Sequence, residues 1–119
     1  MVIHLVFTTK CRHKILEPHH LERMREVCLE VGRKMGFTVL ELNGEMDHVH
    51  LLVEYAPTLS VSSLVNHLKG GSSRMLRKEF GLRPHQDPLW SPRCFAGSCG
   101  GAPIRVVREY IEQQGKKPA

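Results

Sequence analysis

The sequence predicts an α+β protein of the ferredoxin-like, or split β-α-β, class. This class has an antiparallel four-stranded sheet with two helices on one face, and here one extra helix follows at the C-terminal end. The prediction rests on the alternation of two patterns. Short runs rich in β-branched and aromatic residues alternate with longer runs that repeat an apolar residue every three or four positions, in the order β-α-β-β-α-β-α. A length of 119 residues suits one domain, and we expect residues 1–119 to form it.

The first half of the chain contains three predicted strands and one predicted helix. Residues 3–9 are rich in β-branched and aromatic residues, which favours a strand. Residues 19–35 have the apolar spacing of an amphipathic helix, and Gly36 follows where a left-handed residue commonly ends a helix. Residues 37–42 and 48–54 are two more strands, which we expect to pair as a hairpin.

The turn of this hairpin has two candidate positions. Asn43 and Gly44 are a strong turn signal, but Met46 and Asp47 could equally form the bend. The sequence leaves both positions open.

A second helix is predicted to begin after Ser60, which is a suitable N-cap, and to reach about residue 79. Gly70 and Gly71 lie inside it, and each costs about 1 kcal/mol of helix stability relative to alanine. Such a cost is expected where another backbone or a phosphate group must approach closely. The apolar stripe of this helix comprises Val61, Leu64, Val65, Leu68, Met75 and Leu76.

The C-terminal third begins with a predicted loop at 81–92, which contains three prolines. A short strand at 93–99 and a glycine break at 100–101 follow. Pro103 then opens a last helix that Gly115 ends.

Composition excludes several classes of protein. Apolar residues make up 41% and charged residues 24% of the chain, which are values of a globular protein and not of a disordered or fibrous one. The longest nearly uncharged apolar stretch, around 49–53, is far shorter than the ~20 residues of a membrane helix. The chain opens without a secretory leader, and its four cysteines lack metal-type spacing. We therefore expect a cytoplasmic protein with reduced cysteines and no membrane association.

The charge distribution predicts a polyanionic partner. Seventeen Lys and Arg residues against twelve Asp and Glu residues give a net charge of +5, concentrated in two basic clusters near residues 10–14 and 69–83. Nucleic acid is the commonest partner of such clusters, although a solvated basic surface is the alternative. The candidate DNA-binding residues are Lys10, Arg12, Lys69, Arg74 and Arg77.

Two histidines in a predicted strand form a candidate metal site. His48 and His50 are two residues apart, so their side chains point to the same face of the sheet, about 7 Å apart along the strand. Two imidazoles on an open face can bind one divalent ion; the alternative is a pair of surface histidines. Asp47 could orient one of them from behind, or serve only as a turn residue.

The last predicted helix carries two further candidates. Tyr110 and Gln114 are four residues apart and share a helix face. Glutamine offers a neutral oxygen ligand suited to Mg²⁺ or Mn²⁺, and a tyrosine phenol can act as a covalent nucleophile at phosphorus. The alternative is that Tyr110 packs against the sheet. Tyr55 is the other tyrosine, but it lies beside Pro57 without a ligand residue four positions on.

Five segments in this order resemble the single-tyrosine transposases of bacterial and archaeal insertion sequences, which belong to the HUH (His-hydrophobic-His) nucleases. The chain is similar, less closely, to transposases associated with repetitive extragenic palindromes. The resemblance spans essentially the whole chain. Its segments are MDHVHLLV at 46–53, SVS at 60–62, LKGGSSR at 68–74, LWSP at 89–92 and YIEQQ at 110–114.

The resemblance implies a reaction and its residues. It implies that His48, His50 and Gln114 bind a divalent metal ion, Mg²⁺ or Mn²⁺, and that Tyr110 is the nucleophile. It also implies that residues 69–74 lie beside the DNA. Such enzymes cleave and rejoin single-stranded DNA that carries hairpins at the element ends. They work as homodimers in which the tyrosine helix of one subunit serves the histidine pair of the other.

Two other functions remain compatible with the residues. A ferredoxin-like module could bind RNA or DNA without cleaving it, independently of metal. A small zinc-dependent hydrolase would need a third strong ligand, such as His67 or Asp47.

Overall fold

The computed structural model describes residues 1–82 and 89–98. In chain order, the elements are β1 (Val2–Thr9), the short 3₁₀ turn η1 (Lys10–Arg12), α1 (Pro18–Met35), β2 (Phe37–Gly44), β3 (His48–Tyr55), α2 (Val61–Phe80) and β4 (Trp90–Ser98). No helix of the described residues has the length and apolar character needed to cross a membrane. The predicted helix after Pro103 lies outside the described residues.

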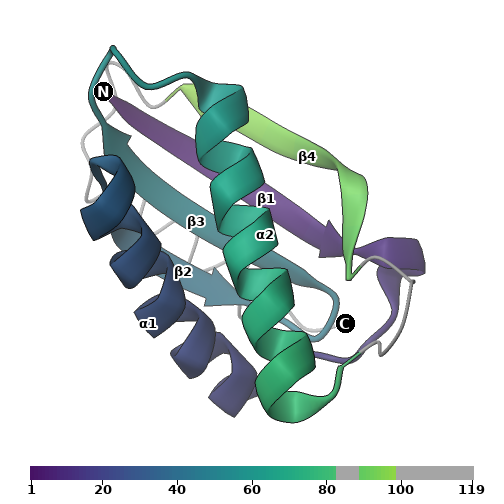
Figure 1. The fold of residues 1–119 in the computed structure, drawn as a ribbon. Coiled ribbons are helices and arrows are strands. Elements are labelled where there is room, and N and C mark those ends of the chain that lie inside the picture. The colour runs from purple at the N-terminus through teal and green to yellow at the C-terminus, as the bar shows by residue number, and fades with distance from the viewer. Residues whose placement is uncertain (83–88, 99–119) are drawn as a thin grey trace.

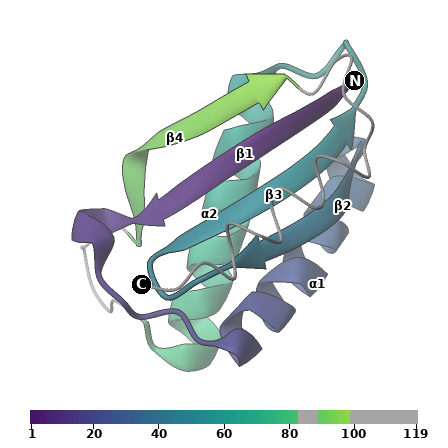
Figure 2. The same cartoon turned by 180° about the vertical axis from the view of Figure 1, so that it is seen from behind.

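The four strands form one antiparallel sheet in the order β2-β3-β1-β4. Both α1 and α2 lie on the same face of this sheet, as Figure 1 and the opposite view in Figure 2 show. The arrangement confirms the predicted α+β, ferredoxin-like class for the described part of the chain. The sheet and its two helices form two layers, with the main apolar core between them.

Strand alternation decides which side chains enter that core. In β1 and β3 every second residue is a buried apolar residue facing the helices, and Leu5 pairs directly with Leu51 across the two strands. The residues between them face the other side of the sheet. The core residues of the two strands are Ile3, Leu5, Phe7, Val49, Leu51 and Val53.

A β-bulge adjusts this alternation in β2. Val39 pairs with Val53, but the next residue pair joins Glu41 to Leu52, so Leu40 is the extra residue. The bulge allows both Val39 and Leu42 to be buried, although three positions separate them.

The hairpin bend lies at Met46 and Asp47, and Asn43 and Gly44 are the last two residues of β2. This decides between the two turn positions that the sequence left open. Gly44 serves a close approach between the strands, because a Cβ at this position would lie 2.4 Å from the carbonyl oxygen of His48.

The ends of α1 follow the sequence signals closely. Pro18 is the first helical residue, one before the predicted start, and the imidazole Nδ1 of His20 accepts the backbone N–H of Glu17 at 3.0 Å. Gly36 ends the helix with φ of 92°, a left-handed conformation that glycine adopts without strain.

In α2, Ser60 caps the first turn as predicted, because its hydroxyl accepts the N–H of Ser63 at 3.2 Å. The two glycines inside the helix have different surroundings. A Cβ at Gly71 would lie 3.1 Å from Val31 of α1, whereas a Cβ at Gly70 would find nothing closer than 3.9 Å. Close approach of α1 therefore accounts for Gly71.

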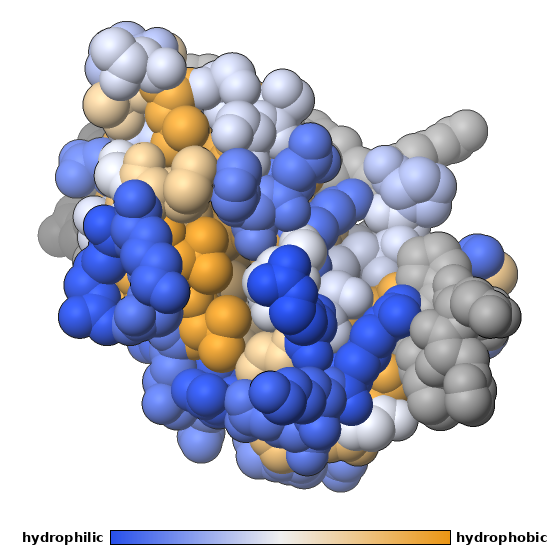
Figure 3. Space-filling model, in the orientation of Figure 1, coloured by the Kyte–Doolittle hydropathy of each residue, from blue (hydrophilic) through white to orange (hydrophobic). Residues whose placement is uncertain are grey.

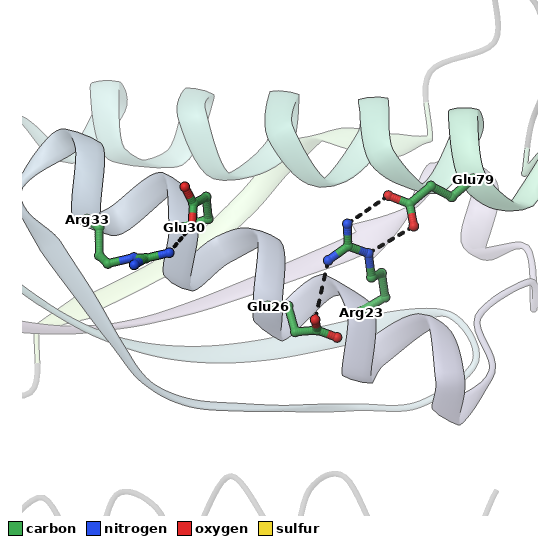
Figure 4. Close-up of polar contacts among 5 residues, drawn as sticks. All are labelled: Arg23, Glu26, Glu30, Arg33 and Glu79. Carbon is green, nitrogen blue, oxygen red and sulfur yellow. Dashed lines mark hydrogen bonds and ion pairs between the residues drawn. The ribbon is translucent and has the colours of Figure 1, made fainter.

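The two helices are also joined by a bidentate ion pair on their outer surface. Arg23 of α1 donates from Nε and from one terminal nitrogen to the two carboxylate oxygens of Glu79 of α2, at 2.9 and 3.0 Å (Figure 4). Neighbouring pairs within α1 join Arg23 to Glu26 and Glu30 to Arg33. Exposed pairs of this kind contribute little to stability each, so the apolar contacts hold the helices together.

The last strand is longer than predicted. The loop assignment of 81–92 is wrong at its end, because β4 begins at Trp90 and not at residue 93. Trp90 is buried, pairs with Thr9 of β1, and donates its indole N–H to the hydroxyl of Ser72 at 3.0 Å. Pro92 is tolerated inside β4 because β4 is an edge strand of the sheet.

Candidate functional site

The predicted histidine pair lies on the face of the sheet that α1 and α2 do not cover. His48 and His50 are in β3, and their ring centroids are 5.1 Å apart with the ring planes nearly perpendicular. His50 is buried with 6% of its surface exposed, while His48 is half-buried. Neither residue belongs to the apolar core between the sheet and the helices. The side chains therefore share one face, as the strand spacing predicted.

A carboxylate lies directly behind His48. One oxygen of Asp47 is 2.8 Å from Nδ1 of His48, and the other accepts Nε of Arg12 at 3.0 Å. Burial acts to raise the pKa of Asp47, but the hydrogen bonds and charges of His48 and Arg12 outweigh it and hold that pKa below its usual range. Asp47 is thus a carboxylate that joins an imidazole to a guanidinium.

The segment after β1 brings Arg12 to this position. Cys11 and Arg12 both have positive φ, 58° and 55°, a conformation that is costly for residues with a side chain. The backbone N–H of Thr9 donates to the carbonyl of Asp47 at 2.9 Å, and its hydroxyl donates to the carbonyl of His13 at 2.8 Å. These bonds hold η1 against the hairpin bend and maintain the strained conformation.

A second histidine lies behind His50. Nε2 of His4 in β1 is 3.1 Å from Nδ1 of His50, and the two rings are stacked with centroids 5.3 Å apart. Burial, with smaller contributions from the charges of His4 and His48, lowers the pKa of His50 to about 4. Burial also lowers the pKa of His4. Burial therefore favours the neutral form of both imidazoles.

His4 was not among the residues selected from the sequence. It is one polar residue inside the predicted strand 3–9, and the period of two places it on the same face as Val6 and Thr8. The sequence does not show which residues of the two strands lie side by side. The strand register does: Val6 pairs with His50 and Thr8 with His48, so His4 lies on the same face as the histidine pair. The signal that could have found His4 is a histidine among apolar residues on the face that carries the metal-type pair.

The donor set of this face fits a divalent metal ion. Both Nδ1 atoms of the pair are engaged, His48 with Asp47 and His50 with His4, and neither Nε2 atom has a hydrogen-bond partner within residues 1–82 and 89–98. Neutral imidazoles with Nε2 available are common ligands of divalent metal ions. Two nitrogen ligands do not complete a shell. The predicted third ligand, Gln114, and the predicted nucleophile, Tyr110, lie outside the described residues.

The predicted DNA-binding residues do not form one patch. Lys10 and Arg12 lie in η1 beside the hairpin bend. Lys69 faces inward: its ammonium donates to the carbonyl of Ser91 at 2.8 Å and lies 5.4 Å from the ring centroid of Phe7.

Arg74 lies in the helical layer, on the other side of the sheet from the histidine pair. It lines a groove of about 800 Å³ that is formed mainly by α1, with the start of β2 and with Gly71 of α2. Figure 3 shows an apolar stripe between hydrophilic margins on this face of the molecule. Arg77 is half-buried one turn further along α2. The sequence clusters are thus divided between the two layers of the fold.

One group of three potential metal ligands was not anticipated. Glu17, His19 and His20 lie close enough at the start of α1 to hold one ion, and no other group of three does so in the described part of the chain. His20, however, uses Nδ1 to accept the backbone N–H of Glu17, and Phe80 packs against both rings. The hydrogen bond and the ring contacts assign these residues to the helix cap.

Residues 1–114 match the model of a protein family described as transposase IS200 like. The chain is 27% identical over 114 residues to the transposase of insertion sequence element IS200 from Salmonella typhimurium, covering 93% of this chain and 74% of the relative. It is 25% identical over 117 residues to the ISDra2 transposase TnpA from Deinococcus radiodurans, covering 96% of this chain and 84% of the relative.

Solved structures agree with this assignment. A candidate transposase from Deinococcus radiodurans R1 superposes with a TM-score of 0.76 and 26% identity, covering 98% of this chain and 92% of that one. A tyrosine transposase bound to a REP hairpin shares the fold, with a TM-score of 0.70 and 16% identity over 95% of this chain and 65% of that one. The match over residues 1–114 and the shared fold lead to one conclusion: this chain belongs to the IS200-like transposase family.

Proposed function

We propose that this transposase cleaves and rejoins single-stranded DNA at the ends of an insertion sequence by transesterification, with residues 1–119 acting as one domain. The observation that carries the proposal is the pair His48 and His50, which lies on the face of the sheet that α1 and α2 do not cover, with both Nδ1 atoms engaged. Family membership supports a reaction on DNA.

The chemical step proposed is an in-line attack by the phenolic oxygen of Tyr110 on a backbone phosphorus atom. A bond forms between this oxygen and phosphorus, and the bond from phosphorus to the 3′ oxygen breaks. The phenolic proton is lost to solvent, and the leaving 3′ oxygen gains one and becomes a hydroxyl. The products are a 5′-phosphotyrosine and a free 3′-hydroxyl, and attack by another 3′-hydroxyl reverses the step. Because the ester is retained, rejoining needs no ATP.

His48, His50 and Gln114 would hold a divalent cation, Mg²⁺ or Mn²⁺. When bound, such a cation neutralises charge on the phosphate and on the leaving oxygen. Asp47 orients the ring of His48 by its 2.8 Å contact with Nδ1, and Arg12 holds Asp47 in place. The guanidinium of Arg12 is largely exposed, so its terminal nitrogens can also bind a DNA phosphate near the site.

We further propose that the DNA partner carries a hairpin near the element end; the tyrosine transposase that shares the fold is bound to a REP hairpin. Lys10, Arg74 and Arg77 are proposed to bind backbone phosphates, and Lys69 would join them only by releasing the carbonyl of Ser91. Binding should then weaken steeply with salt. The division of these residues between the two layers favours DNA that passes from the histidine face around to the helices. We propose a homodimer in which Tyr110 of one subunit serves the histidine pair of the other.

The decisive experiment incubates the purified chain with Mg²⁺ and a labelled hairpin-bearing oligonucleotide, followed by a denaturing gel. We expect a covalent protein–DNA adduct that Tyr110→Phe abolishes while hairpin binding is retained. Tyr55→Phe is the matched control and should keep the adduct. An adduct that persists in Tyr110→Phe would refute the assignment of the nucleophile. Metal-independent binding by the wild type without any adduct would favour a non-catalytic binding module.

A further inference from the structure

His4 contacts His50, and the proposed reaction gives this contact no role. Its Nε2 atom lies 3.1 Å from Nδ1 of His50, its ring stacks on that of His50 at an interplanar angle of 18°, and both residues are buried. The contact joins β1 to β3 diagonally, because the direct partner of His4 across the strands is Leu52 and that of His50 is Val6.

We infer that His4 is a positioning residue for the metal site: its Nε2 accepts the Nδ1 proton of His50 and thereby keeps Nε2 of His50 available as a ligand. The inference rests on the proposed metal-binding role of His50. It assigns a function to a residue of β1 that neither contacts the substrate nor ligates the ion.

Proton counting supports this role. A hydrogen bond between two neutral imidazoles contains one proton, and only two arrangements are possible. If His4 donates from Nε2, the proton of neutral His50 is on its own Nε2, which then cannot ligate. If His50 donates from Nδ1, its Nε2 carries a lone pair. Only the second arrangement is compatible with metal binding.

His48, the other proposed ligand, is also held through its Nδ1 atom, but by a different chemical group. Nδ1 of His48 is held by the carboxylate of Asp47, whereas Nδ1 of His50 is held by an imidazole. The difference follows the surroundings: Asp47 pairs with the exposed Arg12 at the hairpin bend, while the side chain of His4 is buried on the face of the sheet. An unpaired carboxylate at the enclosed position would carry a high desolvation cost, which a neutral imidazole avoids.

Binding of Mn²⁺ to the full-length chain tests the inference. Free Mn²⁺ is measured by electron paramagnetic resonance for the wild type, His50→Ala, His4→Leu and His4→Gln. We expect His50→Ala to lose the site and His4→Leu to raise its Kd 10- to 100-fold. His4→Gln should stay within about threefold of the wild type, because its amide oxygen can replace the imidazole as acceptor. Ile3→Val, in the same strand but on the core face, is the control and should leave the Kd unchanged.

The outcomes separate this inference from the proposed function. If the wild type binds Mn²⁺ through His50 but His4→Leu binds it equally well, the role of His4 is refuted and the metal site stands. If His50→Ala retains the affinity of the wild type, both are refuted.

A second measurement uses the wild type alone and does not depend on the stability of a variant. In ¹⁵N-histidine spectra of the Zn²⁺-loaded protein, Nε2 of His4 should be unprotonated and Nδ1 of His50 protonated. A proton on Nε2 of His4 would overturn the inference.

Discussion

The two faces of the sheet use the same strands for different purposes. On the face that α1 and α2 cover, β1 and β3 contribute only buried apolar side chains, such as Leu5 and Leu51. On the other face, the residues between them include His4, His48 and His50, whose hydrogen bonds extend to Asp47. Because strand side chains alternate with a period of two, adjacent residues of one strand can stabilise the fold and perform chemistry separately.

The two faces also differ in how burial affects the stability of the folded state. Burial of apolar groups stabilises the folded state by about 25 cal/mol per Å². Burial of His50 instead lowers its pKa to about 4, which means that the folded state disfavours its protonated form. One face therefore stabilises the protein over a wide pH range, and the other makes stability depend on pH.

The largest effect is expected for His48→Ala, which removes a proposed ligand and leaves the core face intact. Adduct formation should fall on the order of 10³-fold, because charge stabilisation at the phosphate is lost. The unfolding free energy should change by less than about 1 kcal/mol, since His48 is half-buried and outside the core. Denaturing gels and urea titrations measure the two quantities. Activity of this variant at ordinary Mg²⁺ or Mn²⁺ concentrations would contradict the ligand role.

The opposite pattern is expected for Leu51→Ala. Leu51 follows His50 in β3 and points to the core face of the sheet. Leu51 is fully buried against the helices, so its truncation should cost about 2–5 kcal/mol of unfolding free energy. Adduct formed per folded molecule should stay within about twofold of the wild type. If the residual folded protein were inactive, the two faces would not be independent, and the comparison between them would fail.

The pH dependence of stability should distinguish the faces next. The folded-state pKa of His50 is about 4, below its ordinary value of 6.5, so the unfolded state binds more protons between these values. Stability should therefore be complete above pH 6.5 and decline as the pH falls to about 4, by on the order of 3 kcal/mol. His4 contributes in the same direction.

Urea titrations with EDTA at several pH values measure this decline. His50→Gln, which cannot titrate, should show a smaller decline than the wild type. Identical pH profiles for the two proteins would contradict the cause assigned to the pKa of His50.

The smallest effects are expected in the helical layer, where two adjacent glycines differ. Gly70→Ala should raise the unfolding free energy by about 1 kcal/mol, because alanine favours the helix and its Cβ meets nothing closer than 3.9 Å. Gly71→Ala should lack this gain, since its Cβ would lie 3.1 Å from Val31. Thermal unfolding of the two variants makes the comparison. If Gly71→Ala raised the unfolding free energy as much as Gly70→Ala, the contact with Val31 would be shown to relax without a measurable cost.

Much of the fold was predictable because its signals are local. The apolar spacing of 19–35 and the glycine after it gave α1 to within one residue of its observed start. Ser60 was identified as a cap from its position before an apolar stripe, and the period of two placed His48 and His50 on one face. These features depend on residues within a few positions of one another, where backbone geometry is almost constant.

The features that the sequence-based prediction got wrong or left open depend on contacts between segments that are distant along the chain. The start of β4 at Trp90 depends on its pairing with Thr9 and its hydrogen bond to Ser72, and no local pattern contains either. The bend at Met46 and Asp47 depends on the close approach that Gly44 permits. The roles of Tyr110 and Gln114 remain predictions from the sequence.

The amino-acid sequence by itself determined the fold class, the family and the face on which the histidine pair lies, because period and motif are properties of neighbouring residues. Only the tertiary structure decided which side chains stand behind that pair. Arg12 reaches Asp47 across 35 positions and His4 reaches His50 across 46. Strand register and the strained conformation at Cys11 set those contacts, and both arise from the packing of the whole sheet.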